Sequence, residues 1–207
     1  MNPSELFTST PIVPVVVIDD SSLAVPLADC LAAVGMTSIE ITLRTEGALE
    51  AIKSIATSCP EVCVGAGSIR RVSQIQEALD AGARFCVSPG YTDAIIGEAT
   101  VKSVSLIPGA STATEVMYLF EQGFELIKFF PAELAGGLKM IKALSSPIPE
   151  LQFFPTGGIT AELAKQYLAE SCIPCVGGTW FVPADRVNAA DFGWIAAEAK
   201  AALDMLR

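Results

Sequence analysis

The sequence predicts an α/β fold, a (β/α)8 TIM barrel with an extra N-terminal helix, in which eight strands and eight helices alternate. Three observations support this prediction. Short apolar runs alternate along the chain with longer segments whose apolar residues recur at helical spacing. Gly, Pro, Ser and Thr separate the two kinds of segment, as expected for turns. The length of 207 residues lies at the small end of the range for such barrels, so we expect one domain over residues 1–207.

The apolar runs predict the strands, and the segments between them predict the helices. The predicted strands are 12–18, 38–43, 62–66, 85–88, 105–107, 126–130, 152–155 and 175–176. The predicted helices lie near 21–34, 47–58, 72–81, 92–99, 112–122, 136–145, 160–170 and 191–206. Gly35, Gly82 and Gly123 come where three of these helices should end.

Residues 2–5, Asn-Pro-Ser-Glu, are typical of a capped helix start and predict the extra N-terminal helix, which we expect to cover the floor of the barrel. An open doubly wound sheet is the alternative fold. Its dinucleotide-binding form is disfavoured, because residues 19–22 are Asp-Asp-Ser-Ser where a glycine fingerprint would follow the first strand.

The composition excludes several classes of function. With 13 Lys and Arg against 23 Asp and Glu, the net charge of −10 repels nucleic acids and anionic membranes, so we expect neither as a partner. His is absent, which excludes imidazole bases, Ser/His nucleophile pairs and His-ligated zinc. Acid-base chemistry must use carboxylates, Lys, Tyr or Cys. The N-terminus lacks the pattern of a signal peptide, and no apolar run could span a bilayer, so the sequence predicts a soluble cytoplasmic protein.

Six cysteines are too few for a disulfide scaffold, and we expect mostly buried free thiols. Cys172 and Cys175 have the spacing of a redox motif and could join Cys59 and Cys63 in a four-thiolate metal site. The pattern lacks zinc-ribbon spacing, which disfavours a metal and leaves a redox role open.

Ionisable side chains lie within two of the predicted strands. In 38–44, alternation puts Glu40 and Arg44 on the inward face, where burial is costly unless the two groups pair or act in catalysis. A structural ion pair is the alternative. Lys128 is a solitary amine in an apolar run, and burial beside a cation such as Arg44 favours the neutral amine that forms Schiff bases. A lysine that extends from the strand end to solvent is the alternative.

Two pairs of glycines end the last two predicted strands, Gly157-Gly158 and Gly177-Gly178. Barrels often bind phosphate at these two turns through backbone N–H groups, so the pairs indicate a phosphorylated ligand. The turns at 64–68 and 88–90 add small residues that leave room at the same end of the barrel.

Seven motifs, in this order, resemble the Schiff-base aldolases that act on 2-keto-3-deoxy-6-phosphogluconate (KDPG) and 4-hydroxy-2-oxoglutarate (KHG). They are 39–44, 64–68, 88–90, 106–109, 128–133, 155–159 and 177–180, and the resemblance covers nearly the whole chain. It implies a class I aldolase on a homotrimeric barrel, without metal or cofactor, whose small-molecule partners are a 2-keto acid and a phosphosugar. KDPG would be cleaved to pyruvate and glyceraldehyde 3-phosphate, and KHG to pyruvate and glyoxylate.

The resemblance also implies roles for individual residues. Lys128 would form the Schiff base and Glu40 would be the acid/base. The implied substrate contacts are Arg44, at the carboxylate end of the pyruvate portion, Ser68, Pro89, Phe130 and Thr156, and the implied phosphate contacts are Gly157, Gly158, Gly178 and Thr179. Ser68 and Thr179 stand where the family more often has Thr and Ser, and both keep a hydroxyl. A phosphosugar isomerase or epimerase, with Lys128 acting only electrostatically, and a non-catalytic phosphosugar-binding barrel are the alternatives.

Overall fold

The computed structural model describes residues 11–206, which form an α/β fold with parallel strands. The strands are β1 (Ile12–Val16), β2 (Ser38–Thr42), β3 (Cys63–Gly67), β4 (Cys86–Val87), β5 (Leu106–Ile107), β6 (Gly109–Ala110), β7 (Leu126–Phe129), β8 (Gln152–Pro155) and β9 (Val176–Gly178). The helices are η2 (Ser21–Leu23), α1 (Ala24–Ala33), α2 (Ala48–Ser58), α3 (Ser73–Asp80), α4 (Asp93–Val101), α5 (Ala113–Glu121), α6 (Gly137–Ser145), α7 (Ala161–Leu168), α8 (Ala184–Asn188) and α9 (Phe192–Asp204).

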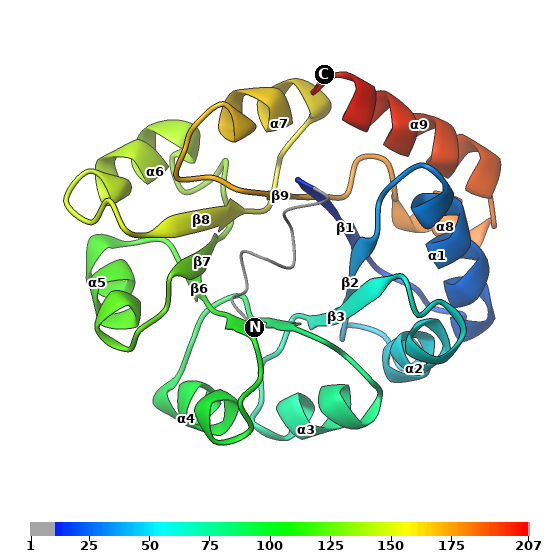
Figure 1. Ribbon diagram of the computed structural model, residues 1–207, viewed down its shortest axis with the longest axis horizontal. Coiled ribbons are helices and arrows are strands. Elements are labelled where there is room, and N and C mark those ends of the chain that lie inside the picture. The colour runs from blue at the N-terminus through cyan, green and yellow to red at the C-terminus, as the bar shows by residue number, and fades with distance from the viewer. Residues whose placement is uncertain (1–10, 207) are drawn as a thin grey trace.

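The strands pair in two parallel sheets, in the orders β5-β4-β3-β2-β1-β9 and β6-β7-β8. Thr156 and Gly177 form an isolated parallel bridge between the end of β8 and β9. Figure 1 shows the helices around the outside of the strands. The β-strands therefore have their carboxyl ends on one side of the molecule, where the turns that follow them come together.

The structure agrees with the predicted alternation and differs from it at two places, β6 and α8. The strand predicted at 105–107 continues as β6 beyond Pro108, whose missing N–H interrupts the ladder. Helix α8 precedes the helix predicted at 191–206 and was not predicted, since five residues are too few for a periodic pattern. The extra helix predicted from residues 2–5 lies outside the described residues.

Helix ends follow the local sequence. Thr92, Thr112 and Thr160 cap α4, α5 and α7 by accepting a hydrogen bond from a backbone N–H in the first turn. Gly35 and Gly123 follow α1 and α5 with φ values of +98° and +86°, a backbone region that glycine enters without strain. The predicted glycine helix ends are confirmed at these positions.

Side chains from both faces of the strands are buried. One face packs against the helices in the main core. The other face forms a smaller apolar cluster of Val13, Cys63, Phe85, Val87, Ile107, Leu126, Phe154 and Cys175. Because side chains alternate along a strand, residues two positions further along point the same way and form the next layer. Lys128 is two residues after Leu126, and Thr156 is two residues after Phe154. Both therefore belong to the next layer, nearer the carboxyl ends of the strands.

All six cysteines are free. Cys63, Cys86 and Cys175 are buried, and burial raises the pKa of the Cys86 thiol to about 12 and that of the Cys175 thiol well above its usual value. A neutral buried thiol is a poor nucleophile and a poor metal ligand. Cys175, one half of the Cys172/Cys175 pair, is therefore a core residue.

In residues 11–206 no helix has the length and apolar character needed to cross a membrane.

Candidate active site

Lys128 and Glu40 meet in the interior, between strands that belong to different sheets. Lys128 on β7 is 5% exposed, and Glu40 on β2 is 0% exposed. Their side chains form an ion pair, with 3.6 Å between Lys128 Nζ and Glu40 Oε1. Since β2 and β7 do not share a ladder, the two side chains meet across the space between the sheets. The prediction that Glu40 and Lys128 point inward is confirmed.

Glu40 has unused hydrogen-bonding capacity. Within the described part of the chain, neither of its buried carboxylate oxygens has a hydrogen-bond partner. Burial of a carboxylate is costly, and the ammonium of Lys128 is the charge that compensates it. A structural ion pair would normally be completed by further hydrogen bonds. This carboxylate can instead take a proton from a neighbouring group and return it.

Two glycines make room for the polar side chains of this layer. A Cβ atom on Gly67, in β3, would overlap Glu40 Oε1, and one on Gly177, in β9, would overlap Thr156 Oγ1. The small residues of the 64–68 turn are recognisable in the sequence, but the contact of Gly67 with the Glu40 carboxylate is not. The glycine was visible in the sequence, whereas its contact with the neighbouring strand β2 depends on the register of β2 and β3.

Phe130 and Thr156 lie beside the ion pair. The Phe130 ring is half-buried, and its centroid is 5.2 Å from Lys128 Nζ, within range of a cation–π contact. Thr156 follows β8 next to β7, since its N–H donates to Phe129 O at 3.0 Å. Thr156 is buried, and its Oγ1 has no hydrogen-bond partner among residues 11–206. These two predicted substrate contacts therefore join Lys128 in one interior site.

Arg44 does not lie where the alternation predicted. Strand β2 ends at Thr42, and Arg44 is an exposed residue of the following turn. Its Nε donates to Thr42 Oγ1 at 3.2 Å, and that hydroxyl donates to Val16 O at 2.9 Å. Alternation within a strand does not extend to this turn, so the expectation that Arg44 is buried on the inward face is wrong. The alternative of a structural Glu40–Arg44 ion pair is wrong as well, because the ion pair of Glu40 is with Lys128.

Ser68 and Pro89 follow β3 and β4 at the same end of the strands. Ser68 is half-buried and has a φ of +59°, a left-handed conformation that costs a non-glycine residue on the order of 1–3 kcal/mol. Such strain is often found at functional turns. Pro89 is exposed. Both predicted contacts lie outside the buried layer, on the rim formed by the turns.

The four predicted phosphate contacts come together at the ends of β8 and β9. Gly157 and Gly158 have φ values of +104° and +77° and precede α7. Gly178 is buried in β9, and Thr179 is exposed just beyond it. The bridge from Thr156 to Gly177 puts the two turns side by side. Positive φ at successive glycines allows backbone N–H groups to converge on an anion.

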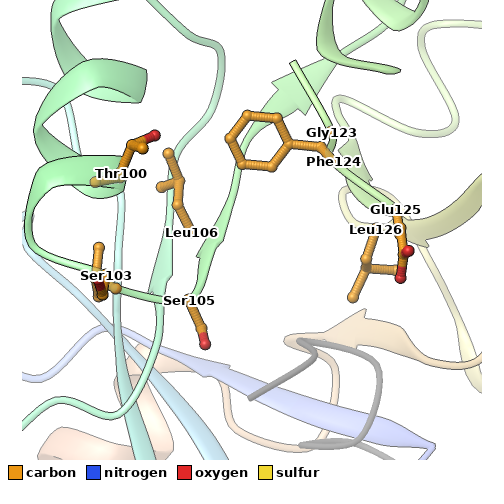
Figure 2. Close-up of a pocket in the computed structure, with 10 residues that line it drawn as sticks. Thr100, Ser103, Ser105, Leu106, Gly123, Phe124, Glu125 and Leu126 are labelled. Atoms are coloured by element: carbon orange, nitrogen blue, oxygen red, sulfur yellow. The ribbon is translucent and has the colours of Figure 1, made fainter. Parts of the chain in front are cut away.

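A separate cavity of ≈ 530 Å³ lies at the opposite end of the strands, and Figure 2 shows residues that line it. Ser105, Leu106, Glu125 and Leu126 line it at the beginnings of β5 and β7, together with residues that end α4 and follow α5. It does not include the buried ion pair.

Within residues 11–206, no group of three His, Cys, Asp or Glu side chains could hold a metal ion.

Comparisons with known proteins show the family. The family model "KDPG and KHG aldolase" matches residues 4–197. The KHG/KDPG aldolase of Escherichia coli (strain K12) is 42% identical over 199 residues, which are 96% of this chain and 93% of that protein.

Two crystal structures are also similar. One is the KDPG aldolase of Legionella pneumophila, with pyruvate captured at low pH as a covalent carbinolamine intermediate. Its TM-score is 0.94 at 36% identity, over 98% of each chain. The other is the aldolase of Zymomonas mobilis ZM4 with 3-phosphoglycerate. Its TM-score is 0.90 at 41% identity, over 96% of this chain and 93% of that one.

The close contact between Gly67 and the Glu40 carboxylate can be tested by substitution. Gly67→Ala should push the Glu40 carboxylate away from Lys128 and destabilise the protein by about 1–3 kcal/mol through overpacking. Gly97→Ala is the matched control, because Gly97 lies in α4 with open space around its Cβ position, and alanine there should stabilise the helix slightly. Urea unfolding and a crystal structure of each variant measure the two effects. Unchanged stability and an unchanged Lys128–Glu40 distance in Gly67→Ala would contradict the argument.

Proposed function

The chain belongs to the KDPG and KHG aldolase family, and we propose that it cleaves KDPG reversibly to pyruvate and glyceraldehyde 3-phosphate through an imine on Lys128. One observation carries the proposal: the buried Lys128 amine lies 3.6 Å from a buried carboxylate that has no hydrogen-bond donor in the described part of the chain. The covalent pyruvate intermediate of the Legionella relative supports the same chemistry here. Cleavage of KHG to pyruvate and glyoxylate is a second activity, supported by the double name of the Escherichia coli relative.

Lys128 first gives its ammonium proton to Glu40, and the neutral amine attacks the C2 carbonyl of KDPG to form a carbinolamine. Glu40 returns this proton to the carbinolamine hydroxyl, which leaves as water and gives an iminium ion that accepts the electron pair of the C3–C4 bond. Glu40, directly or through water, takes the C4 hydroxyl proton as that bond breaks and glyceraldehyde 3-phosphate leaves. Glu40 then returns a proton to C3 of the enamine, and hydrolysis of the pyruvate imine restores Lys128. The iminium is the electron sink, so no step requires a metal or a cofactor.

The remaining predicted residues divide between the two ends of the substrate. We assign the pyruvate carboxylate to Arg44 and Ser68 at the rim, and the walls of the pocket to Phe130 and Pro89. Thr156, whose buried hydroxyl has no partner within residues 11–206, would face the polar atoms near C4.

The phosphate would bind the two glycine turns, at Gly157, Gly158, Gly178 and Thr179. The net charge of −10 does not prevent this, because salt screens exposed charges beyond about 8 Å.

We also infer that the strands close into one eight-stranded barrel, in which β5 and β6 are one strand interrupted at Pro108. Three contacts support closure: the pairing of β9 with β1, the pairing of β6 with β7, and the bridge between Thr156 and Gly177. A closed barrel would bring Glu40 and Lys128 together from opposite sides of its interior. That residues 1–207 form a single domain in the cytoplasm stays a prediction.

A homotrimer is proposed as the working assembly. Met117 and Phe120 are exposed apolar residues that line an apolar groove of ≈ 350 Å³ between α5 and α6, which supports contact with another copy. Light scattering of the purified protein should give roughly three times the 21.7 kDa mass of the chain. Phe120→Asp should shift the mass downward. A monomer mass for the unaltered protein at micromolar concentration would refute the trimer.

The imine on Lys128 can be tested directly. Pyruvate and borohydride should add a reduced pyruvate adduct to Lys128, detected by peptide mass spectrometry. Lys128→Met should fold, lose the adduct and lose cleavage activity by roughly 1,000-fold or more. Lys139→Met removes an exposed lysine of α6 and is the matched control, with labelling and activity retained. Labelling of Lys139 or Lys142, or no labelling, would favour an isomerase or a binding protein instead.

The role of Glu40 as a proton carrier predicts a specific kinetic defect. Glu40→Gln keeps the shape of the side chain and removes the base, so the pyruvate imine should still form. Exchange of the pyruvate methyl protons with D₂O, followed by NMR, should slow by about 10²- to 10⁴-fold. Glu50→Gln, at an exposed carboxylate of α2, should exchange normally. Wild-type exchange in folded Glu40→Gln would leave water, Thr156 or another carboxylate as the base.

A further inference from the structure

A tyrosine and a glutamate form a short hydrogen bond behind the turn that ends β8. Tyr167, on α7, is fully buried, and its hydroxyl donates to Glu133 Oε1 at 2.5 Å. Glu133 lies in the turn between β7 and α6. Burial and the hydrogen bond to Glu133 raise the pKa of Tyr167 far above its ordinary value. The hydroxyl is therefore a permanent donor, and it fixes the direction of the carboxylate.

Glu133 holds the glycine turn through its backbone and through the stem of its side chain. Its N–H donates to Gly157 O at 3.2 Å, and the preceding Ala132 N–H donates to Thr156 O at 2.8 Å. A Cβ atom on Gly158 would lie 3.0 Å from Glu133 Cβ and 3.1 Å from its Cγ, so Gly158 rests on the glutamate stem. Gly157 and Gly158 have no side chains of their own to restrain them. Contacts from Glu133 supply that restraint.

The Tyr167–Glu133 pair also connects this turn to α6 and α7. A Cβ on Gly137, the first residue of α6, would lie 3.3 Å from both Tyr167 Oη and Glu133 Oε1. Tyr167 belongs to the helix that begins just after Gly158. The hydrogen bond therefore joins the turn after β7, the start of α6 and the body of α7 at one point.

We propose that Glu133 and Tyr167 are positioning residues for the phosphate subsite, holding the backbone of Gly157 and Gly158 in the conformation that receives the substrate phosphate. This inference rests on the phosphate binding assigned to that turn under the proposed function. Because the pair acts on the turn and does not contact Lys128 or Glu40 in the described structure, its loss affects binding of phosphorylated substrate and spares imine chemistry.

The test separates phosphate binding from catalysis. In Tyr167→Phe, KM for KDPG should rise about 3- to 10-fold while kcat changes less than about 2-fold, the result expected when one hydrogen bond of about 0.5–1.5 kcal/mol is lost. Imine formation with pyruvate, which carries no phosphate, should match wild type. Glu133→Ala should raise KM for KDPG at least as much. Glu133→Gln keeps the stem and an oxygen acceptor for Tyr167, so it should restore KM to near the wild-type value.

Tyr118→Phe is the matched control. The Tyr118 hydroxyl donates to Asp93 Oδ1 at the same 2.5 Å, but it joins α5 to α4 rather than the glycine turn. Its KM for KDPG should stay at the wild-type value. Three results would overturn the proposal. KM for KDPG could rise as much in Tyr118→Phe as in Tyr167→Phe, pyruvate imine formation in Tyr167→Phe could fall as much as KDPG binding, or Glu133→Gln could fail to restore KM. If Tyr167→Phe does not fold, Glu133→Ala at its exposed position decides the question. Failure of the aldolase function itself would appear separately, as no imine and no KDPG cleavage in the wild type.

Discussion

The burial of two opposite charges at one point between β2 and β7 is the constraint on which the rest of the structure depends. Lys128 and Glu40 lose most of their hydration, and a pair 3.6 Å apart recovers only part of that free energy. The surrounding layers compensate. Gly67 gives the carboxylate its space, and the apolar cluster that includes Leu126 and Phe154 closes the interior on one side of the pair. Stability comes from these layers, and the cost of the buried ion pair is consistent with the catalytic role proposed for it.

Because the strands are parallel, the two ends of the strands differ in composition and in the parts of the chain that gather there. Apolar side chains fill the interior toward the strand beginnings, whereas the polar layer and the turns lie at the carboxyl ends. Ser68, Pro89 and the glycine turns can therefore differ in shape without disturbing the core beneath them. The bridge between Thr156 and Gly177 joins the two glycine turns across strands that are otherwise in different sheets. A substrate with a keto acid at one end and a phosphate at the other fits this arrangement.

Local sequence patterns predicted what depends on local geometry. Alternation placed Glu40 and Lys128 inward correctly because both lie within a strand, and it failed for Arg44 because β2 had already ended at Thr42. The pairing of Lys128 with Glu40, and of Tyr167 with Glu133, joins elements distant in the chain. Such contacts depend on how the strands and helices pack, and no periodicity in one segment specifies them. For the same reason the sequence predicted which residues form the candidate site but did not predict the contacts that hold them.

The two glutamates near the site show how environment divides the roles of one residue type. Glu40 is buried, has no hydrogen-bond donor in the described part of the chain and faces an amine, so its oxygens are available to accept and return a proton. Glu133 is an exposed residue, and one of its carboxylate oxygens already accepts a hydrogen bond from a tyrosine that keeps its proton. A carboxylate held in this way is a fixed acceptor. The two environments therefore suit the roles proposed for these residues, proton transfer for Glu40 and positioning for Glu133.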